Sequence, residues 1–354
     1  AGEHADQGTP GGDRGRRRVP LFLNFQARRA EIWRAASVTA GRADSASRRS
    51  TVISKTQAGR SPGARAMGAA TPLPLTLHEP ASTIVNMDSS GDPDPDTEPL
   101  LLTRDGTVAT LTINRPRRLN ALTYAMFSQL PKLLEEAAAM PGIRALVLRG
   151  AGTRAFSAGA DISEFETTRM TREQAAAYDD AVLAAEEALA SFPAPTLAAV
   201  HGHCYGGGCA LAIACDIRFA AAGARFAITP AKLGLVYPLR GTKRLVDLVG
   251  PSRAKIILMS GADYSAVQAQ AFGLTDEVFG DPAALDAGVR EFTALLAARS
   301  SVTQRAVKET VARILDGATH DDESHALLRE SALYSPDYAE GVRAFLERRP
   351  PVFG

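Results

Sequence analysis

The chain has 354 residues, of which 45% are hydrophobic and 22% charged, and its formal net charge is only +1. This length allows one large domain or two ordinary ones, and the near-zero net charge excludes a strong overall attraction to nucleic acid or anionic lipid. The sequence contains no apolar run of about 18 residues, so it predicts no transmembrane helix.

Residues 1–99 differ in composition from everything that follows. They are rich in arginine, serine and alanine, and they end in the run DSSGDPDPDTEP, which is typical of a solvated linker. We therefore predict a disordered, basic and proline-rich extension.

Three interpretations of this extension remain open. Its Arg- and Ser-rich composition fits a presequence for the mitochondrial matrix. Its charge fits a nucleic-acid arm, although no aromatic residues are interleaved with the basic ones. Met87 lies just before the first convincing strands, so the segment before it also fits upstream sequence outside the working protein. We favour the third interpretation and expect a cytoplasmic protein with no nucleic-acid or membrane partner.

A regular pattern of strands and helices follows the extension. Residues 100–114 predict a β-hairpin with its turn at Asp105-Gly106. Residues 123–140 predict a helix in which Pro131 is a candidate break. Residues 143–150 then predict a buried strand.

The alternation of strands and helices continues to about residue 281. We expect a helix from about 172 to 190, a strand over 195–200 and a helix that starts near Gly207. These units recur about every fifty residues, which favours repeated ββα units around parallel strands. We assign this α/β core to residues 100–281.

Residues 282–354 predict helices without strands. Helical stretches cover about 281–300, 303–317 and 321–348, and Ser335-Pro336 in the last stretch has the pattern of an N-cap followed by the first helical residue. A run of helices after a strand-rich core packs either on that core or on a neighbouring subunit. We therefore expect a C-terminal helical layer.

The three cysteines lie close together, at positions 204, 209 and 215. A disulfide framework usually needs an even number of cysteines in a short secreted chain, so we expect reduced thiols packed in the core. Although His201 and His203 lie nearby, no Cys-x-x-Cys spacing supports a metal site. We predict no bound metal.

Two loops, each after a strand, carry the functional signal. The first is RAFSAGADISEF, residues 154–165, and the second is HGHCYGGGCALAIACD, residues 201–216. Small residues let the backbone approach a ligand closely, and the second loop aims the start of a helix, with its free N–H groups, at that ligand. The G-x-G-x-x-G spacing and the Gly-Lys-Ser/Thr ending are both absent, so neither a dinucleotide fingerprint nor a P-loop is indicated.

Together with two further segments, these loops resemble the crotonase superfamily, also called the enoyl-CoA hydratase/isomerase family. The segments that carry the resemblance are RPRRLNAL at 115–122, FSAGAD at 156–161, the glycine loop at 202–216 and EGVRAFLERRPPVF at 340–353. The resemblance covers about residues 100–354. It implies a crotonase-type α/β spiral with a C-terminal helical layer, assembled as homotrimers or hexamers.

The resemblance also implies chemistry on coenzyme A thioesters, with CoA as part of the substrate and no separate cofactor. The thioester oxygen would be held by the backbone N–H groups of Ala160 and Gly207, an oxyanion hole that stabilises an enolate. The CoA portion would contact the residues Arg117, Arg118, Leu119, Ala158 and Asp161. The two arginines are equally consistent with ordinary solvated charges, and Asp161 with a cap on the following turn.

The sequence departs from the family's hydratases at both acid–base positions. Those enzymes carry one glutamate directly after G-G-G-x and a second in a F-x-x-P-E-x-x-L-G stretch, and these positions are Ala210 and Pro230 here. Each positioned acid or base contributes roughly 10² to 10⁴ in rate. An ordinary hydratase mechanism is therefore disfavoured.

The stretch ITPAKLGLVYP resembles instead the T-P-x-x-L-G-x-x-Y segment of family members that decarboxylate methylmalonyl-type CoA esters. The match places Tyr237 near the reacting carbon as a catalytic side chain, whereas the alternative is a wall residue of the acyl pocket. Those members carry a histidine where this chain has Ala160, which leaves His203 as a weaker candidate. We expect decarboxylation or isomerisation by a lyase or isomerase. The alternatives are a hydratase with a non-standard acid or base and a non-catalytic acyl-CoA-binding subunit.

Overall fold

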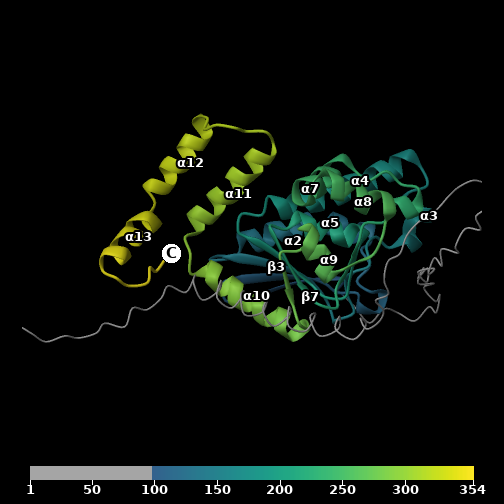
Figure 1. The fold of residues 1–354 in the computed structure, drawn as a ribbon, viewed down its shortest axis with the longest axis horizontal. Helices are drawn as coiled ribbons and strands as arrows, with labels where there is room; N and C mark the ends of the chain where they lie inside the picture. Colours follow the sequence, from purple (N-terminus) through teal and green to yellow (C-terminus); the bar gives the residue numbers. More distant parts are fainter. Residues whose placement is uncertain (1–97) are drawn as a thin grey trace, which may run out of the picture. The chain divides into compact units, whose positions relative to one another are not determined.

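The computed structural model describes residues 98–354, so the predictions made for residues 1–97 lie outside the described residues. The strands of this part form two sheets, one of six strands and one of four (Figure 1). The repeated ββα units predicted from the sequence are confirmed, because each of three strands in the large sheet is followed by a strand of the small sheet and then by a helix.

The large sheet has the order β1-β2-β3-β5-β7-β10. Its strands are β1 (Leu100–Asp105), β2 (Val108–Ile113), β3 (Ala145–Gly150), β5 (Thr196–Val200), β7 (Ile217–Ala221) and β10 (Glu277–Phe279). The first two form the predicted antiparallel hairpin, with Asp105 opposite Val108 and Gly106 in the turn at φ +56°. The other neighbours are parallel. Strand β5 is buried throughout, as expected in a sheet covered on both faces.

The small sheet has the order β4-β6-β8-β9. Its strands are β4 (Ala155–Ser157), β6 (His203–Tyr205), β8 (Arg225–Ala227) and β9 (Tyr264–Ser265). These strands have only two or three residues, too few to show an alternation of apolar and polar side chains, so the sequence did not predict this sheet. It nevertheless fixes the starts of the two glycine-containing loops, since β4 and β6 are parallel neighbours.

Helices cover one face of the large sheet, where Figure 1 shows α2 and α5 beside the strands and α4 beyond them. The bounds on this side are α2 (Tyr124–Ala139), α3 (Phe165–Thr168), α4 (Arg172–Ala190), α5 (Gly206–Ala214), α6 (Pro230–Leu233), α7 (Leu239–Val249), α8 (Pro251–Ser260) and α9 (Ala266–Phe272). Two 3₁₀ turns, η1 (Pro116–Arg118) and η2 (Ile162–Glu164), precede α2 and α3. Helix α4 has the predicted bounds, and a capping box of Thr171 and Gln174 explains its start.

Helix α2 runs through Pro131 without the break that we considered. A proline inside a helix removes one backbone hydrogen bond and crowds the preceding turn. Here the buried side chains of Phe127, Leu130 and Leu134 lie on both sides of Pro131 and anchor the helix to the core. Packing therefore outweighs the local cost of the proline.

The opposite face of the sheet is covered by α10 (Pro282–Ala297), as Figure 1 shows. Leu285 and Val289 of this helix pack with Val147, Leu197 and Phe219 in a second, smaller hydrophobic cluster. The last strand, β10, ends at Phe279, and α10 starts at Pro282.

Three more helices complete the described chain: α11 (Ser301–Leu315), α12 (Glu323–Leu333) and α13 (Pro336–Leu346). Ser335 caps α13 as predicted, because its hydroxyl accepts a hydrogen bond from the Tyr338 N–H at 3.1 Å. Lys308 of α11 contacts the core through Asp216 at 2.7 Å and the Ala194 carbonyl at 3.2 Å. No helix among residues 98–354 is long and apolar enough to cross a membrane.

Candidate active site

The two glycine-containing loops leave the small sheet side by side. In the parallel pair β4 and β6, Ala155 lies opposite His203 and Ser157 opposite Cys204. The chain therefore continues into Ala158–Ala160 after one strand and into Gly206–Gly208 after the other. Parallel neighbours end at the same edge of a sheet, so the two loops start side by side.

The backbone N–H groups of Ala160 and Gly207 lie close together at this edge. A Cβ built on Gly207 would be 3.7 Å from the Ala160 nitrogen, and one built on Gly159 would be 3.4 Å from the Gly207 nitrogen. No backbone acceptor within residues 98–354 takes up either N–H. Two adjacent free donors, one of them in the first turn of α5, form an arrangement suited to an anionic oxygen.

Glycine is required here for geometric reasons. Gly159 has φ +96° and Gly206 has φ +49°, in the left-handed region that other residues rarely adopt. A Cβ on Gly159 would also lie 2.8 Å from the Tyr205 carbonyl oxygen. At Gly207 a Cβ would approach the Phe127 ring to 3.1 Å, so this ring forms one wall beside the two donors.

The segment before α2 holds the first loop in place through the side chain of Asn120. Asn120 is fully buried, and its side-chain amide donates to the carbonyls of Ala155 at 2.6 Å and Ala151 at 3.0 Å. Its side-chain oxygen accepts from the Arg115 N–H at 3.0 Å. The sequence motif pointed to this segment as a CoA contact, but its structural role as a brace was not predicted.

Asp161 caps the turn that follows the first loop, as one of our two interpretations expected. Its carboxylate accepts hydrogen bonds from Arg115 at 2.9 Å and from the Ser163 hydroxyl at 2.6 Å and N–H at 3.2 Å. Burial raises the pKa of Asp161, but the hydrogen bonds from Ser163 and Arg115 outweigh it, so the net pKa is below its ordinary value. The side chain is occupied by the protein, and its predicted contact with CoA stays a prediction.

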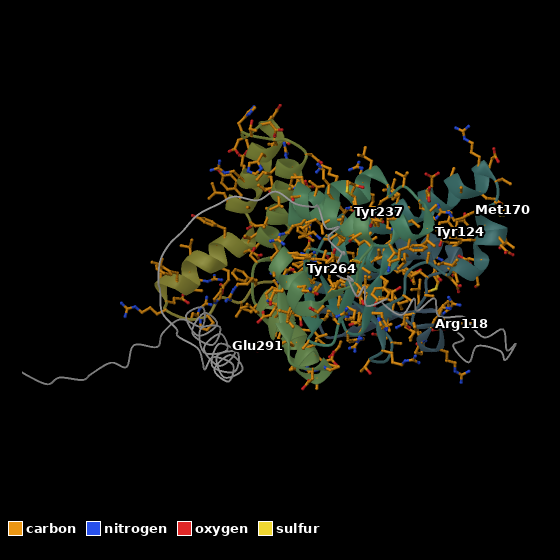
Figure 2. The ribbon with its side chains drawn as sticks, turned by 45° about the vertical axis from the view of Figure 1, so that its right-hand side comes forward. Arg118, Tyr124, Met170, Tyr237, Tyr264 and Glu291 are labelled. Atoms are coloured by element: carbon orange, nitrogen blue, oxygen red, sulfur yellow. The ribbon has the colours of Figure 1, made fainter. Side chains whose placement is uncertain are left out.

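The other residues predicted to contact CoA lie around η1. Arg117 is exposed, Arg118 and Leu119 are half-buried, and the Leu119 carbonyl accepts from the Ala158 N–H at 2.9 Å. Within residues 98–354 neither arginine forms an ion pair, so both are free to meet phosphate groups. Figure 2 shows Arg118 well separated from Tyr237, and the predicted contacts of these residues with CoA and the acyl group stay predictions.

The structure places no carboxylate at the two hydratase positions. Ala210 is buried in α5, and Pro230 is the first residue of α6. Glu164, the second acid of the first loop, accepts a hydrogen bond from the Tyr124 N–H at the start of α2. Burial raises its pKa, although this hydrogen bond opposes the effect.

Tyr237 lies in the segment between α6 and α7 and is half-buried, packed against the main hydrophobic core. Its hydroxyl is buried and has no hydrogen-bond partner among the described residues. A Cβ on Gly241 would lie 2.8 Å from the Tyr237 ring, so this glycine makes room for it. Burial raises the pKa of Tyr237 well above its ordinary value, and Glu186 and Cys209 raise it further. The hydroxyl therefore carries its proton at neutral pH.

His203 is paired with Tyr205, its neighbour on β6, through a contact of 2.9 Å between Nδ1 and the tyrosine hydroxyl. The three cysteines are buried and free, and burial raises the pKa of Cys215 to about 12. Among residues 98–354, no group of three or more His, Cys, Asp or Glu side chains is arranged to hold a metal ion.

Comparison with known proteins identifies the family. The profile described as Enoyl-CoA hydratase/isomerase matches residues 103–354. The 2,3-dehydroadipyl-CoA hydratase of Escherichia coli is 34% identical over 259 residues, which cover 72% of this chain and 98% of that protein. The short-chain-enoyl-CoA hydratase of Clostridium acetobutylicum is 32% identical over 256 residues, or 71% and 95% of the two chains.

A solved structure agrees with this relationship. An enoyl-CoA hydratase/isomerase family protein from Hyphomonas neptunium has a TM-score of 0.71 and 38% identity, and the match covers 73% of this chain and 98% of that one. The fold described above is thus shared with a related chain. The chain belongs to the enoyl-CoA hydratase/isomerase family, the crotonase superfamily, whose enzymes act on acyl-CoA thioesters.

Proposed function

We propose that the protein forms a thioester enolate by decarboxylating a malonyl-type CoA ester. The observation that carries this proposal is the pairing of two free backbone donors, on Ala160 and Gly207, with the lack of a carboxylate at positions 210 and 230. A carboxylate there would repel the negative charge of a malonyl-type substrate. The alanine and the proline at these positions carry no charge and do not repel the substrate carboxylate.

The chemistry balances without an added oxidant or metal. The bond between the α-carbon and the substrate carboxylate breaks, carbon dioxide leaves, and its electron pair moves into the enolate. The two N–H groups stabilise the enolate oxygen, and one such donor is typically worth about 3 to 4 kcal/mol in the transition state. A proton then adds to the α-carbon. Tyr237, whose hydroxyl keeps its proton, is the side chain that we assign to this last step.

Hydration is the second candidate, and the names of the relatives favour it. Both curated relatives described above are named hydratases. Hydration needs an acid or base that delivers water, and Glu164 is the carboxylate of the first loop whose pKa burial raises. The Glu164 carboxylate accepts a hydrogen bond from the Tyr124 N–H at the start of α2. Because this contact already occupies the carboxylate, we rank hydration second.

Mass spectrometry with a panel of CoA esters in deuterated water tests the proposal on the full chain. The panel contains malonyl-CoA, methylmalonyl-CoA and an enoyl-CoA. We expect loss of carbon dioxide from a malonyl-type ester with one deuterium retained at the α-carbon. Addition of water to the enoyl ester would overturn decarboxylation in favour of hydration. Deuterium exchange without other change would indicate isomerisation, and no reaction would indicate a binding subunit.

We also propose that the chain assembles into homotrimers or hexamers. Helices α11, α12 and α13 line a groove with apolar side chains, among them Val311, Leu328 and Phe345. Phe345 is 83% exposed and Leu346 74% exposed, which is unusual for large apolar residues in an isolated subunit. Light scattering on the purified full chain gives the mass, and a monomer would contradict this proposal.

A further inference from the structure

An aromatic ring closes one side of the two free backbone donors. Phe127 of α2 is fully buried, and a Cβ built on Gly207 would lie 3.1 Å from the Cζ atom of its ring. Carbon atoms in favourable contact are about 3.5 to 4.0 Å apart. A methyl-sized group on this side of Gly207 therefore already presses on the ring, so the space beside this donor ends at Phe127.

The Phe127 ring is held in place by Tyr178 of α4. The two ring centres are 6.0 Å apart and the rings meet edge to face at 64°. Tyr178 is only 1% exposed, and both residues belong to the main hydrophobic core. Side chains in a close-packed interior have no free volume into which they can turn. Phe127 and Tyr178 together therefore form a fixed wall.

Tyr178 is in turn held by its own neighbours. Tyr124 stacks on its ring and Phe165 packs edge-on against it, each with ring centres 5.7 Å apart. The Arg169 guanidinium lies 4.8 Å from the centre of the Tyr178 ring and 5.2 Å from that of Phe165, and it donates to Asp179 at 2.8 Å. A cation over an aromatic face is attracted to it. These contacts fix the second ring of the wall.

The wall lies on the Gly207 side of the donor pair, and the predicted CoA contacts lie on the other side. The Leu119 carbonyl, beside η1, accepts from the Ala158 N–H on the loop that carries the Ala160 donor. A thioester whose oxygen lies between the two donors has its sulfur on one side of the carbonyl carbon and its acyl chain on the other. With the sulfur on the Leu119 side, the acyl chain runs toward Phe127.

We propose that Phe127, backed by Tyr178, determines substrate specificity by limiting the length of the acyl group. The site then takes short acyl groups, among them the malonyl type, and excludes medium-length chains such as octanoyl. The inference rests on the proposed function for the position of the thioester oxygen. It concerns the binding of the acyl chain and not the bond that breaks.

The test measures the binding of propionyl-CoA and octanoyl-CoA to the full chain by titration calorimetry. Both are saturated thioesters without a carboxylate to lose, so binding is measured in the absence of decarboxylation. We expect the wild type to bind octanoyl-CoA at least roughly tenfold more weakly than propionyl-CoA. Phe127→Ala should strengthen octanoyl-CoA binding roughly tenfold and leave propionyl-CoA binding within about threefold.

Phe219→Ala is the matched control. Phe219 is also buried and lies 5.3 Å from the rings of Phe279 and Phe292, but in the second hydrophobic cluster beside α10. Its loss should lower stability in a similar way and leave the ratio of the two affinities as in the wild type. If Phe127→Ala does not fold, Phe127→Leu removes the ring at a smaller cost in packing and should shift the ratio in the same direction.

The outcomes separate this inference from the proposed function. A wild type that binds both thioesters equally, or Phe127 variants whose affinity ratio equals that of Phe219→Ala, would overturn the length limit without bearing on decarboxylation. A preference for propionyl-CoA that is lost in the Phe127 variants would support the length limit even if the wild type decarboxylates no ester of the panel. Binding of neither thioester would overturn both.

Discussion

Leu122 and Ala160 form an isolated parallel β-bridge between the segment before α2 and the first glycine loop. The Leu122 N–H donates to the Gly159 carbonyl at 2.8 Å, and the Asp161 N–H donates to the Leu122 carbonyl at 2.8 Å. The bridge thus engages the Gly159 carbonyl and the Asp161 N–H, which flank the Ala160 N–H in the chain. It holds that donor in place and leaves it free for a ligand.

The first prediction concerns the residue type at position 160. Because the donor is a backbone N–H, Ala160→Gly should keep kcat/KM within about threefold, whereas Ala160→Pro, which lacks the N–H, should lower kcat roughly 10² to 10³-fold. Steady-state kinetics with the malonyl-type ester that the wild type decarboxylates checks both variants. A thermal melt shows whether the proline variant is folded, and a folded Ala160→Pro with wild-type kcat would contradict the assigned donor.

The second prediction concerns the tight packing at the start of α5. A Cβ on Gly208 would lie 2.5 Å from the Ser157 Cβ, and we expect Gly208→Ala to lower the free energy of unfolding by about 1 to 3 kcal/mol. Helix propensity alone predicts the opposite sign, about 1 kcal/mol in favour of alanine. Urea unfolding measures the difference. Gly223→Ala is the control, because a Cβ there meets nothing within 4 Å.

The third prediction concerns the acid sensitivity that Asp161 confers. Its pKa is lowered in the folded protein, so its ionised form stabilises the native state. This contribution is complete above the unfolded-state pKa of about 3.9 and is lost as the pH falls through the lower, folded-state value. Asp161→Asn should cost about 2 kcal/mol at pH 7, and the difference from wild type should shrink below about pH 4.

Urea unfolding across this pH range measures that difference. Asp105→Asn, at an exposed position in the hairpin turn, provides the control. A stability difference for Asp161→Asn that stays constant down to pH 3 would show that the carboxylate charge is not the stabilising element.

The fourth prediction concerns His201, which is 1% exposed and has no hydrogen-bond partner for either ring nitrogen within the described chain. Burial lowers its pKa, and Arg149 lowers it further. The unfolded chain therefore takes up a proton near pH 6.5 that the native state does not, so stability falls as the pH drops from about 6.5 toward the folded-state pKa. We expect His201→Gln to be less sensitive to pH in this window than the wild type.

Unfolding free energies at pH 8, 6 and 5 give the change of stability with pH for the wild type and for His201→Gln. His203→Gln is the matched control, because His203 is only half-buried and its Nδ1 contacts the Tyr205 hydroxyl. If His201→Gln and the wild type lose stability equally between pH 8 and pH 5, buried His201 is not the cause.

Much of the fold was predictable because its signals are local. The turn at Asp105-Gly106 and the bounds of α4 follow from turn chemistry and helical periodicity, and the structure confirms both. The pairing of Ala160 with Gly207 was implied by the family resemblance, whereas the parallel pair β4 and β6 that brings the two loops together became visible only in the structure. The candidate helix break at Pro131 is absent, because the packing of α2 against the core outweighs the local cost of the proline.

The buried ion pair between Glu186 and Arg244 was not predictable from the sequence, for a physical reason. Glu186 and Glu187 are adjacent in the sequence, and nothing local tells which one faces inward. The answer depends on α7, which brings Arg244 to both of them although it lies 58 residues after Glu186 in the chain. Asn120 and Arg115 were missed similarly, because their partners on the first loop are distant in sequence.

That both oxygen-binding donors belong to the main chain has a consequence for how this protein can lose or change its activity. No single side-chain replacement other than proline deletes either donor, so harmful substitutions act mainly by displacing the loops, for example through the bridge at Leu122 or the brace at Asn120. Conversely, the side chains around the donors can be exchanged while the donors persist. A lineage with this scaffold can therefore acquire a different reaction by replacing acids and bases alone.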